Sequence, residues 1–219
     1  MRISAATATL LLASALSIPG CGGLFESKLD APQTYVLRLP PAASVNAAGA
    51  TPLGSVLVQR PEASPGLNTD LIALLRSDRR FDYYSATRWA APLPDVVESV
   101  IVDALRGTGA FSAVMDDSSP FAPRYNLRIT LRRFEADYTA GEIAPTVHVI
   151  LDGTLGRHRD RALLGSFTAQ GSVRATEDRV TAVVAAFEAA TTAALSELTQ
   201  ATTSALASDQ KAAEEGLRR

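Results

Sequence analysis

Apolar residues with helical spacing mark two segments of the chain. The first begins near Pro94 and is closed by Gly107 and Gly109, which predicts an amphipathic helix. The second is longer, has Thr176 as a candidate N-cap and carries acidic residues in its first turn. Its apolar face consists of Val180, Val183, Val184, Phe187, Leu195 and Leu198. Each predicted helix has one face to bury against another layer.

Alternation of apolar and polar residues predicts long strands in the second half of the chain. Residues 124–132 alternate with a period of two, as in a strand with one face in water. After Arg132 the apolar positions change parity, beginning with Phe134, and a β-bulge would produce this change. Two further strands, predicted over 147–155 and 162–173, complete an antiparallel meander.

Shorter strands are predicted in the first half, and together the elements indicate the fold class. Their ranges are 34–39, 55–60, 71–75 and 81–84. The last two flank a polar turn and resemble a hairpin. The order of strands, helix, strands and helix predicts an α+β fold, a mostly antiparallel sheet with two amphipathic helices packed on one face.

The N-terminus follows a different pattern, that of a secretion signal. Arg2 is followed by an uncharged apolar run from Ile3 to Ile18, which is the length of a signal-peptide core. The run Ile18-Pro19-Gly20-Cys21 resembles the lipobox of bacterial lipoproteins, and Cys21 is the single cysteine of the chain. We therefore expect residues 1–20 to be a signal peptide and Cys21 to carry covalent lipid.

These patterns divide the chain into four parts. The signal at 1–20 is followed by a lipidated tether at 21–33, a folded domain at 34–200 and a polar C-terminal tail at 201–219. A lipid anchor on Cys21 would hold the protein to a membrane. Gly22, rather than aspartate, after the cysteine favours the periplasmic face of the outer membrane over the inner membrane.

Composition narrows the function classes. The chain has 21 basic and 23 acidic residues, a net charge of −2, and removing Arg2 with the signal gives 20 − 23 = −3. This balance provides no general attraction to nucleic acid. We expect no apolar segment after residue 20 to be long enough to span a bilayer, so the chain after the signal is predicted to be soluble.

A search for catalytic or cofactor chemistry finds no recognisable motif. The histidines, His148 and His158, have no metal-site spacing, and one cysteine cannot form a thiolate metal site. Neither a nucleophile elbow nor a phosphate-binding loop is present. The sequence thus indicates a protein that is not an enzyme, with no catalytic or metal residues and no cofactor beyond the lipid on Cys21.

One cluster of aromatic and arginine side chains has two interpretations. It can pack in the core at a sheet edge, or it can form a partner-docking surface, where Tyr, Trp and Arg are enriched. Its candidate docking residues are Tyr83, Tyr84, Arg88 and Trp89. A second feature, the stripe of Arg124, Arg128 and Arg132 on one strand face, is either solvated or faces an acidic partner or anionic headgroups.

A series of short motifs, in a fixed order, resembles a known family. The motifs include Pro65-Gly66-Leu67-Asn68-Thr69-Asp70, Phe81-Asp82-Tyr83-Tyr84, Arg88-Trp89-Ala90, Pro92-Leu93-Pro94, Gly109-Ala110-Phe111 and Ala186-Phe187-Glu188. Together they resemble the ABC-type transport auxiliary lipoprotein component family, which includes the paraquat-inducible C-type lipoproteins. The likeness runs from about Tyr35 to Leu198, and Asn68 stands where the family often has aspartate.

The resemblance implies a non-catalytic subunit of an MCE-type ABC system that moves phospholipid or other hydrophobic compounds between the two membranes. Its partners would be the MCE-type periplasmic substrate-binding protein, an ABC permease and an ATPase, and a homo-oligomer is left open. Two other function classes stay open: a lipoprotein enzyme acting on envelope material, and a structural envelope lipoprotein that binds a neighbour without transport.

Overall fold

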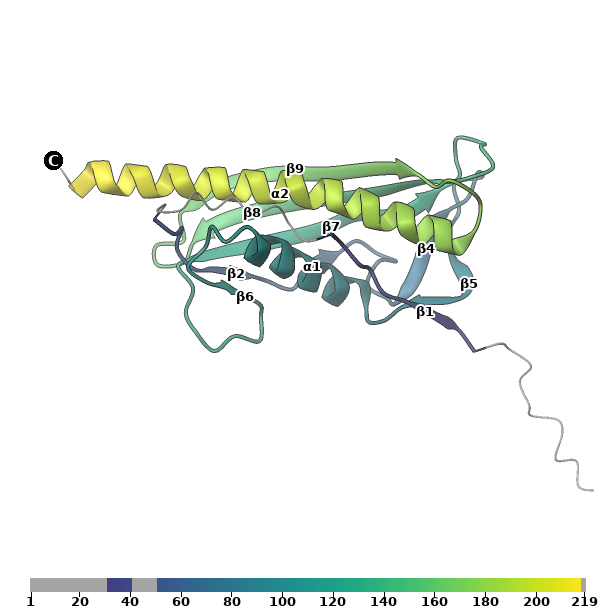
Figure 1. Ribbon diagram of the computed structural model, residues 1–219, viewed down its shortest axis with the longest axis horizontal. Helices are drawn as coiled ribbons and strands as arrows, with labels where there is room; N and C mark the ends of the chain where they lie inside the picture. Colours follow the sequence, from purple (N-terminus) through teal and green to yellow (C-terminus); the bar gives the residue numbers. More distant parts are fainter. Residues whose placement is uncertain (1–30, 41–50, 218–219) are drawn as a thin grey trace, which may run out of the picture. The chain divides into compact units, whose positions relative to one another are not determined.

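The computed structural model describes residues 31–40 and 51–217. The predicted signal 1–20 and Cys21 lie outside these residues. Within the described ranges the chain forms nine strands and two helices (Figure 1). In chain order they are β1 Gln33–Tyr35, β2 Val56–Val58, β3 Glu62–Ala63, β4 Leu71–Leu75, β5 Phe81–Trp89, α1 Leu93–Gly107, β6 Val114–Met115, β7 Tyr125–Asp137, β8 Thr146–Arg157, β9 Leu163–Arg174 and α2 Val180–Leu217.

The three longest strands form the predicted antiparallel meander. β7 pairs with β8 along its length, and β8 pairs in turn with β9. The register of β7 shifts between Leu131 and Arg133, so that no β8 residue lies opposite Arg132 in the backbone pairing, and the predicted β-bulge is confirmed. The extra residue returns Phe134 to the core face that Leu131 occupies, and both side chains are fully buried. This explains the change of hydrophobic parity in the sequence.

The other edge of β7 makes the sheet mixed, so the prediction of a mostly antiparallel sheet is wrong for the first half of the chain. β2, β3 and β4 run parallel to β7, β6 runs parallel to β2, and β1 runs parallel to β5. The β4–β5 pair is the antiparallel hairpin that was predicted. Parallel pairing needs a long connection, and α1 with its flanking loops lies between β2 and β7 in the sequence.

The segment after β1 leaves the sheet and contacts α2. Pairing of β1 with β5 ends at Tyr35, the second residue of the strand predicted at 34–39. Leu37 is nevertheless buried, and the backbone N–H of Arg38 donates a 2.8 Å hydrogen bond to Glu188 Oε1. The rest of the predicted strand thus connects the start of the domain to its last helix.

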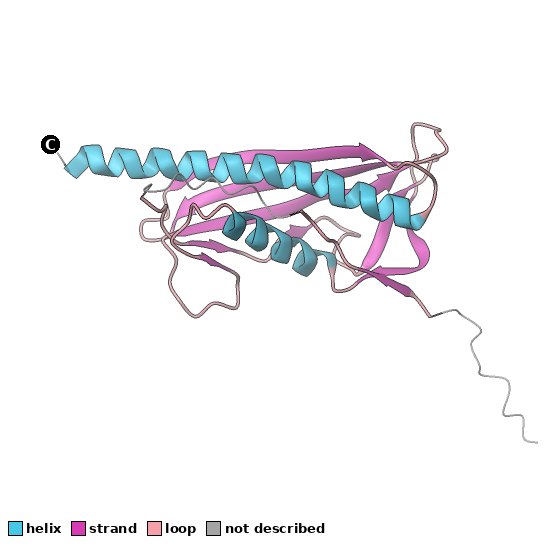
Figure 2. Ribbon diagram, in the orientation of Figure 1, coloured by secondary structure: helices cyan, strands magenta, loops and turns pink. Residues whose placement is uncertain are grey.

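Both helices cover the same face of the sheet, as predicted (Figures 1 and 2). α1 begins at Leu93 with a proline in its first turn, and α2 lies along β8 and β9. A single core fills the space between the layers. Its centre is an aromatic cluster in which Phe134 and Phe187 stack at 4.8 Å and Trp89 contacts both rings edge-on. Such pairs stabilise beyond the area they bury.

The start of α2 differs from its prediction. The helix begins at Val180 rather than after Thr176, because residues 176–179 form a bend. Asp178, expected in the first turn, instead accepts a 2.5 Å hydrogen bond from the hydroxyl of Tyr138. A tertiary contact has therefore replaced the local capping interaction that the sequence suggested.

The end of α2 also differs, because residues 201–217, predicted as part of a polar tail, continue the helix. Leu206 in this part is fully buried. The carboxylate of Asp209 accepts hydrogen bonds from the Tyr125 hydroxyl, at 3.0 Å, and from Arg157. The domain thus extends past residue 200, and these contacts fasten the continued helix to β7 and β8.

α2 is also long and apolar enough to cross a membrane, as judged by length and composition alone. Within Val180–Gly216 its most apolar window has a mean hydropathy of 1.2, and 44% of that window is buried inside the protein. The expectation that no second segment reaches this length is therefore wrong by this criterion. The packing of α2 along β8 and β9 is that of a core helix.

Candidate functional site

The four predicted docking residues all lie on β5 but do not form one surface. The register of β5 against β4 shifts between Tyr83 and Arg88, and Ala86 in this interval has a φ of 53°, in the left-handed region. Such an irregularity redirects the side chains that follow it. It separates Tyr83 and Tyr84 at the start of β5 from Arg88 and Trp89 at its end.

The second pair contains one core residue and one surface residue. Trp89 is 1% exposed and packs 5.4 Å from Phe187 and 5.9 Å from Phe134 between ring centroids. For Trp89 the structure agrees with the core-packing interpretation and places it away from any docking surface. Arg88 is exposed, with Nη1 3.3 Å from the carboxylate of Asp70.

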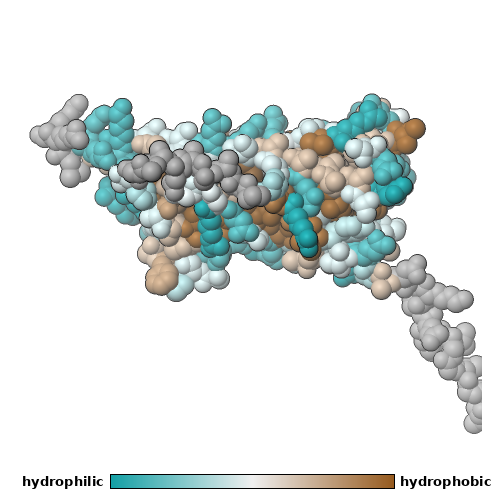
Figure 3. All heavy atoms as spheres, viewed as in Figure 1, coloured by the Kyte–Doolittle hydropathy of each residue, from teal (hydrophilic) through white to brown (hydrophobic). Residues whose placement is uncertain are grey.

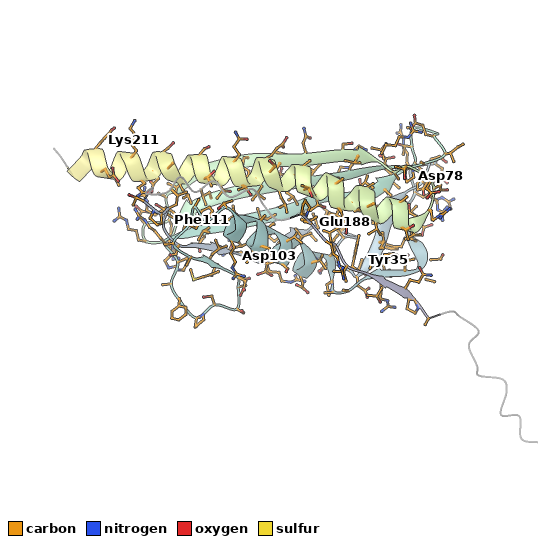
Figure 4. All side chains as sticks on the ribbon, in the orientation of Figure 1. Tyr35, Asp78, Asp103, Phe111, Glu188 and Lys211 are labelled. Atoms are coloured by element: carbon orange, nitrogen blue, oxygen red, sulfur yellow. The ribbon has the colours of Figure 1, made fainter. Side chains whose placement is uncertain are left out.

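The first pair lies in a groove of about 510 Å³ at one end of the sheet. We call this the loop end, because it is formed by the turns 76–80, 138–145 and 175–179, which follow β4, β7 and β9. Figure 4 shows Asp78 at this end and Lys211 at the opposite end of the domain. Tyr83 and Tyr84 are both half-buried walls of the groove.

A chain of hydrogen bonds ties the groove to the start of α2. The Tyr138 hydroxyl donates to Asp178, so the Tyr84 hydroxyl, 2.8 Å from it, acts as the donor to Tyr138. Burial, together with the bond to Tyr138, raises the pKa of Tyr84 far above its usual range. Burial and the bond to Asp178 raise the pKa of Tyr138 to about 12. Both phenols are therefore neutral hydrogen-bonding groups at physiological pH, not bases.

Three of the four charged side chains that line the groove are in ion pairs, and the fourth, Asp178, accepts the hydrogen bond from Tyr138. Arg76 lies 2.6 Å from Asp82, and Arg80 lies 2.6 Å from Asp78. The hydroxyl of Tyr83 donates to a backbone carbonyl at 3.0 Å. Tyrosine rings beside paired charges give a surface of mixed polarity, as protein–protein interfaces have.

A second groove, of about 420 Å³, lies beside α1 and was not predicted. Asp95 and Glu98 of α1 line it with Asp116, Asp117 and Arg60. Arg60 pairs with Asp95, and Glu98 accepts a 3.2 Å hydrogen bond from the backbone of Asp117. Burial raises the pKa of Glu98. In the sequence, only the spacing of Asp95 and Glu98, three residues apart on α1, indicates this groove. Arg60 precedes Asp95 by 35 residues, so no local pattern predicts that it joins them.

Neither histidine lines these grooves, and each contacts a polar side chain of a neighbouring strand. His148 Nδ1 is 3.2 Å from the Ser172 hydroxyl, and burial together with the charge of Arg133 lowers the pKa of His148. His158 Nδ1 is 3.1 Å from the side-chain amide of Asn126. Among residues 31–40 and 51–217, no group of three or more His, Cys, Asp or Glu side chains is placed to hold a metal ion.

Comparison with known protein families shows which family this chain belongs to. The family model for the ABC-type transport auxiliary lipoprotein component matches residues 35–209. The chain belongs to this family. The match confirms the resemblance seen in the motifs and extends it past Leu198 to Asp209, which lies in the part of α2 predicted to be a polar tail. The predicted lipidation site, Cys21, lies outside the matched residues.

Two solved structures place the auxiliary lipoprotein among proteins of the same fold. A protein from Xanthomonas campestris, of family DUF330, is 26% identical with a TM-score of 0.73, covering 82% of this chain and 99% of that one. An uncharacterised protein is 14% identical with a TM-score of 0.61, covering 79% and 99%. A comparison with curated protein sequences gives no match.

Proposed function

We propose that this auxiliary lipoprotein is a non-catalytic, membrane-anchored subunit of an MCE-type ABC transport system. Its partners are the MCE-type periplasmic substrate-binding protein, the permease and the ATPase of that system. The cargo is phospholipid or another hydrophobic compound that moves between the inner and outer membranes. Cys21 carries the lipid anchor, and Gly22 directs the protein to the outer membrane. The observation that carries the proposal is the family match over residues 35–209.

The geometry supports a binding role. The phenols of Tyr84 and Tyr138 keep their protons at neutral pH, and each charged side chain in their groove has an ion-pair or hydrogen-bond partner. A domain of this kind does no work on a cargo by itself. It acts through a partner that is coupled to an energy source elsewhere, and the groove with Tyr83 and Tyr84 is our candidate surface for that partner.

Direct binding to the MCE protein is the test. A soluble form beginning at residue 22 is titrated calorimetrically with the periplasmic domain of the MCE protein encoded nearby. We expect association at tens of micromolar or tighter. The net charge is small, so the contact should be mainly apolar and persist in moderate salt.

Matched variants locate the contact. Tyr84→Ala should weaken binding at least tenfold while circular dichroism shows a folded domain, and Leu163→Ala, at the opposite end of the sheet, should bind as the parent does. Equal binding by both variants would remove the groove from the proposal. If the parent does not associate and no MCE gene lies nearby, the chain is better explained as a structural envelope lipoprotein.

A further inference from the structure

The loop end is also the end from which the chain enters the domain. β1 runs parallel to β5 and pairs with its last residues, Thr87 to Trp89. The chain therefore approaches β1 from the direction of Phe81, which lies at the loop end. Figure 1 shows the described chain beginning on this side, while α2 ends on the other. Cys21 precedes Ala31 by ten residues, which span at most about 36 Å. The twelve-residue β8, about 40 Å long, separates the loop end from the opposite end of the sheet.

The loop end exposes large apolar side chains. Ile143, in the turn between β7 and β8, is 86% exposed, and Phe81 at the start of β5 is 43% exposed. Figure 3 shows brown, hydrophobic surface beside teal, hydrophilic side chains at this end, and teal side chains on the last turns of α2. Leu163, at the other end of β8, is 67% exposed and provides a natural comparison for Ile143.

The charges around Ile143 are balanced. Arg174 lies 2.6 Å from Glu142, and Arg179 lies 3.3 Å from Glu177. A surface with exposed apolar side chains and paired charges matches a bilayer interface rich in zwitterionic headgroups. A strongly acidic or basic partner would call for an excess of the opposite charge.

We infer that the loop end faces the membrane and that Ile143 lies in the lipid interface. This inference rests on the proposed lipidation of Cys21, because the short connection to the anchor brings the loop end, and not the end with Leu163, to the bilayer. Ile143 alone does not hold the protein there; it fixes which end is turned toward the lipid. The groove with Tyr83 and Tyr84 then lies beside the membrane surface, where a bound partner has access to lipid.

Site-directed fluorescence on the full lipidated protein tests the orientation. Acylation consumes the thiol of Cys21, so Ile143→Cys and Leu163→Cys each introduce the single free thiol of the chain. Each variant is labelled with an environment-sensitive fluorophore and reconstituted into vesicles of phosphatidylethanolamine and phosphatidylglycerol. Nitroxide lipids, with the spin label in the headgroup or shallow in the acyl chain, act as quenchers.

We expect nitroxide lipids to quench the label at position 143 at least threefold more than the label at position 163. Equal quenching, or stronger quenching at 163, in protein whose intact mass carries the lipid would overturn the orientation and leave the proposed transport role untouched. Protein that lacks lipid on Cys21 would overturn the anchor and the orientation together. Unlipidated protein mixed with the same vesicles serves as the reference for contact without an anchor.

Discussion

Gly171 of β9 lies directly against the backbone of Ala190 in α2. A Cβ atom at Gly171 would fall 1.9 Å from the carbonyl oxygen of Ala190 and 2.7 Å from its carbonyl carbon. No side chain fits in that space, and the obstacle is backbone rather than a flexible group. The spacing between α2 and the sheet is thus set by direct backbone contact, which requires glycine on the strand.

Gly171→Ala should therefore destabilise the domain by about 1–3 kcal/mol, because α2 has to move away from β9. Denaturant unfolding of the soluble form measures the loss. Gly165→Ala on the same strand is the control, since the nearest atom to its Cβ would be 4.0 Å away on Ala205. Similar losses for the two variants would show that α2 does not approach β9 as described.

Phe187→Ala should cost about 3–5 kcal/mol of unfolding free energy, the usual cost of emptying a buried aromatic site. Phe187 is fully buried and contacts both Phe134 and Trp89. The matched control is Phe121→Ala, because Phe121 is 72% exposed and its removal should change stability by no more than about 0.5 kcal/mol. Denaturant melts with tryptophan fluorescence report both values, and a loss below about 1 kcal/mol for Phe187 would contradict its place in the core.

Asp209 should make the domain sensitive to acid. Burial opposes its charge, but hydrogen bonds from Arg157 and Tyr125 outweigh burial and lower the pKa of Asp209. A lowered folded-state pKa means that the stabilisation is present above the unfolded value of about 4 and is lost as the pH falls through the folded value. Asp209→Asn should cost about 1 kcal/mol at pH 7 and flatten the loss of stability as the pH falls below about 4.

Asp160→Asn is the control for this prediction. Asp160 pairs with the same Arg157 at 2.6 Å, but its side chain is 43% exposed. Solvent screens such a pair, so its removal should have a smaller effect at pH 7. Melts of the parent and both variants across the acid range separate the two carboxylates. An unchanged pH profile in Asp209→Asn would show that the contact to α2 does not stabilise the fold.

Cys21→Ala should leave an unprocessed precursor, because acylation and signal cleavage both require the thiol. Intact-mass analysis of membrane-extracted protein distinguishes the precursor from the mature form. Gly22→Asp keeps the thiol and should still be processed, while the sorting rule moves it toward the inner membrane. A mature N-terminus other than lipidated Cys21 in the parent protein would refute the lipoprotein assignment.

The sequence predicts those parts of the fold in which a hydrophobic pattern repeats over many residues. The strands β7 to β9 and the bulge after Leu131 follow from alternation over many residues, and α1 follows from its stripe and its glycine stop. β2, β3 and β6 have two or three residues each, too few to show a period, and no local pattern states their direction. The mixed sheet is a product of long-range pairing, which one sequence does not reveal.

The candidate site shows the same limit. The sequence predicts that Tyr84 and Trp89 belong to one cluster, because no local pattern indicates that Ala86 between them has a positive φ. Glycine adopts that conformation more readily than alanine does. The loop end was equally hidden, since it joins turns from three separate parts of the chain. The end of α2 was missed because the partners of Asp209, Tyr125 and Arg157, are 84 and 52 residues away.

The position of α2 as the last element has a consequence for how the protein folds. A chain emerges from the ribosome N-terminus first, so all nine strands precede the helix that covers β8 and β9. Trp89 and Phe134 keep an open face until the residues around Phe187 arrive, and the parallel pairs close large loops, which slows folding. Late closure leaves apolar surface of the sheet exposed until the final helix docks, and exposed apolar surface favours aggregation during that time.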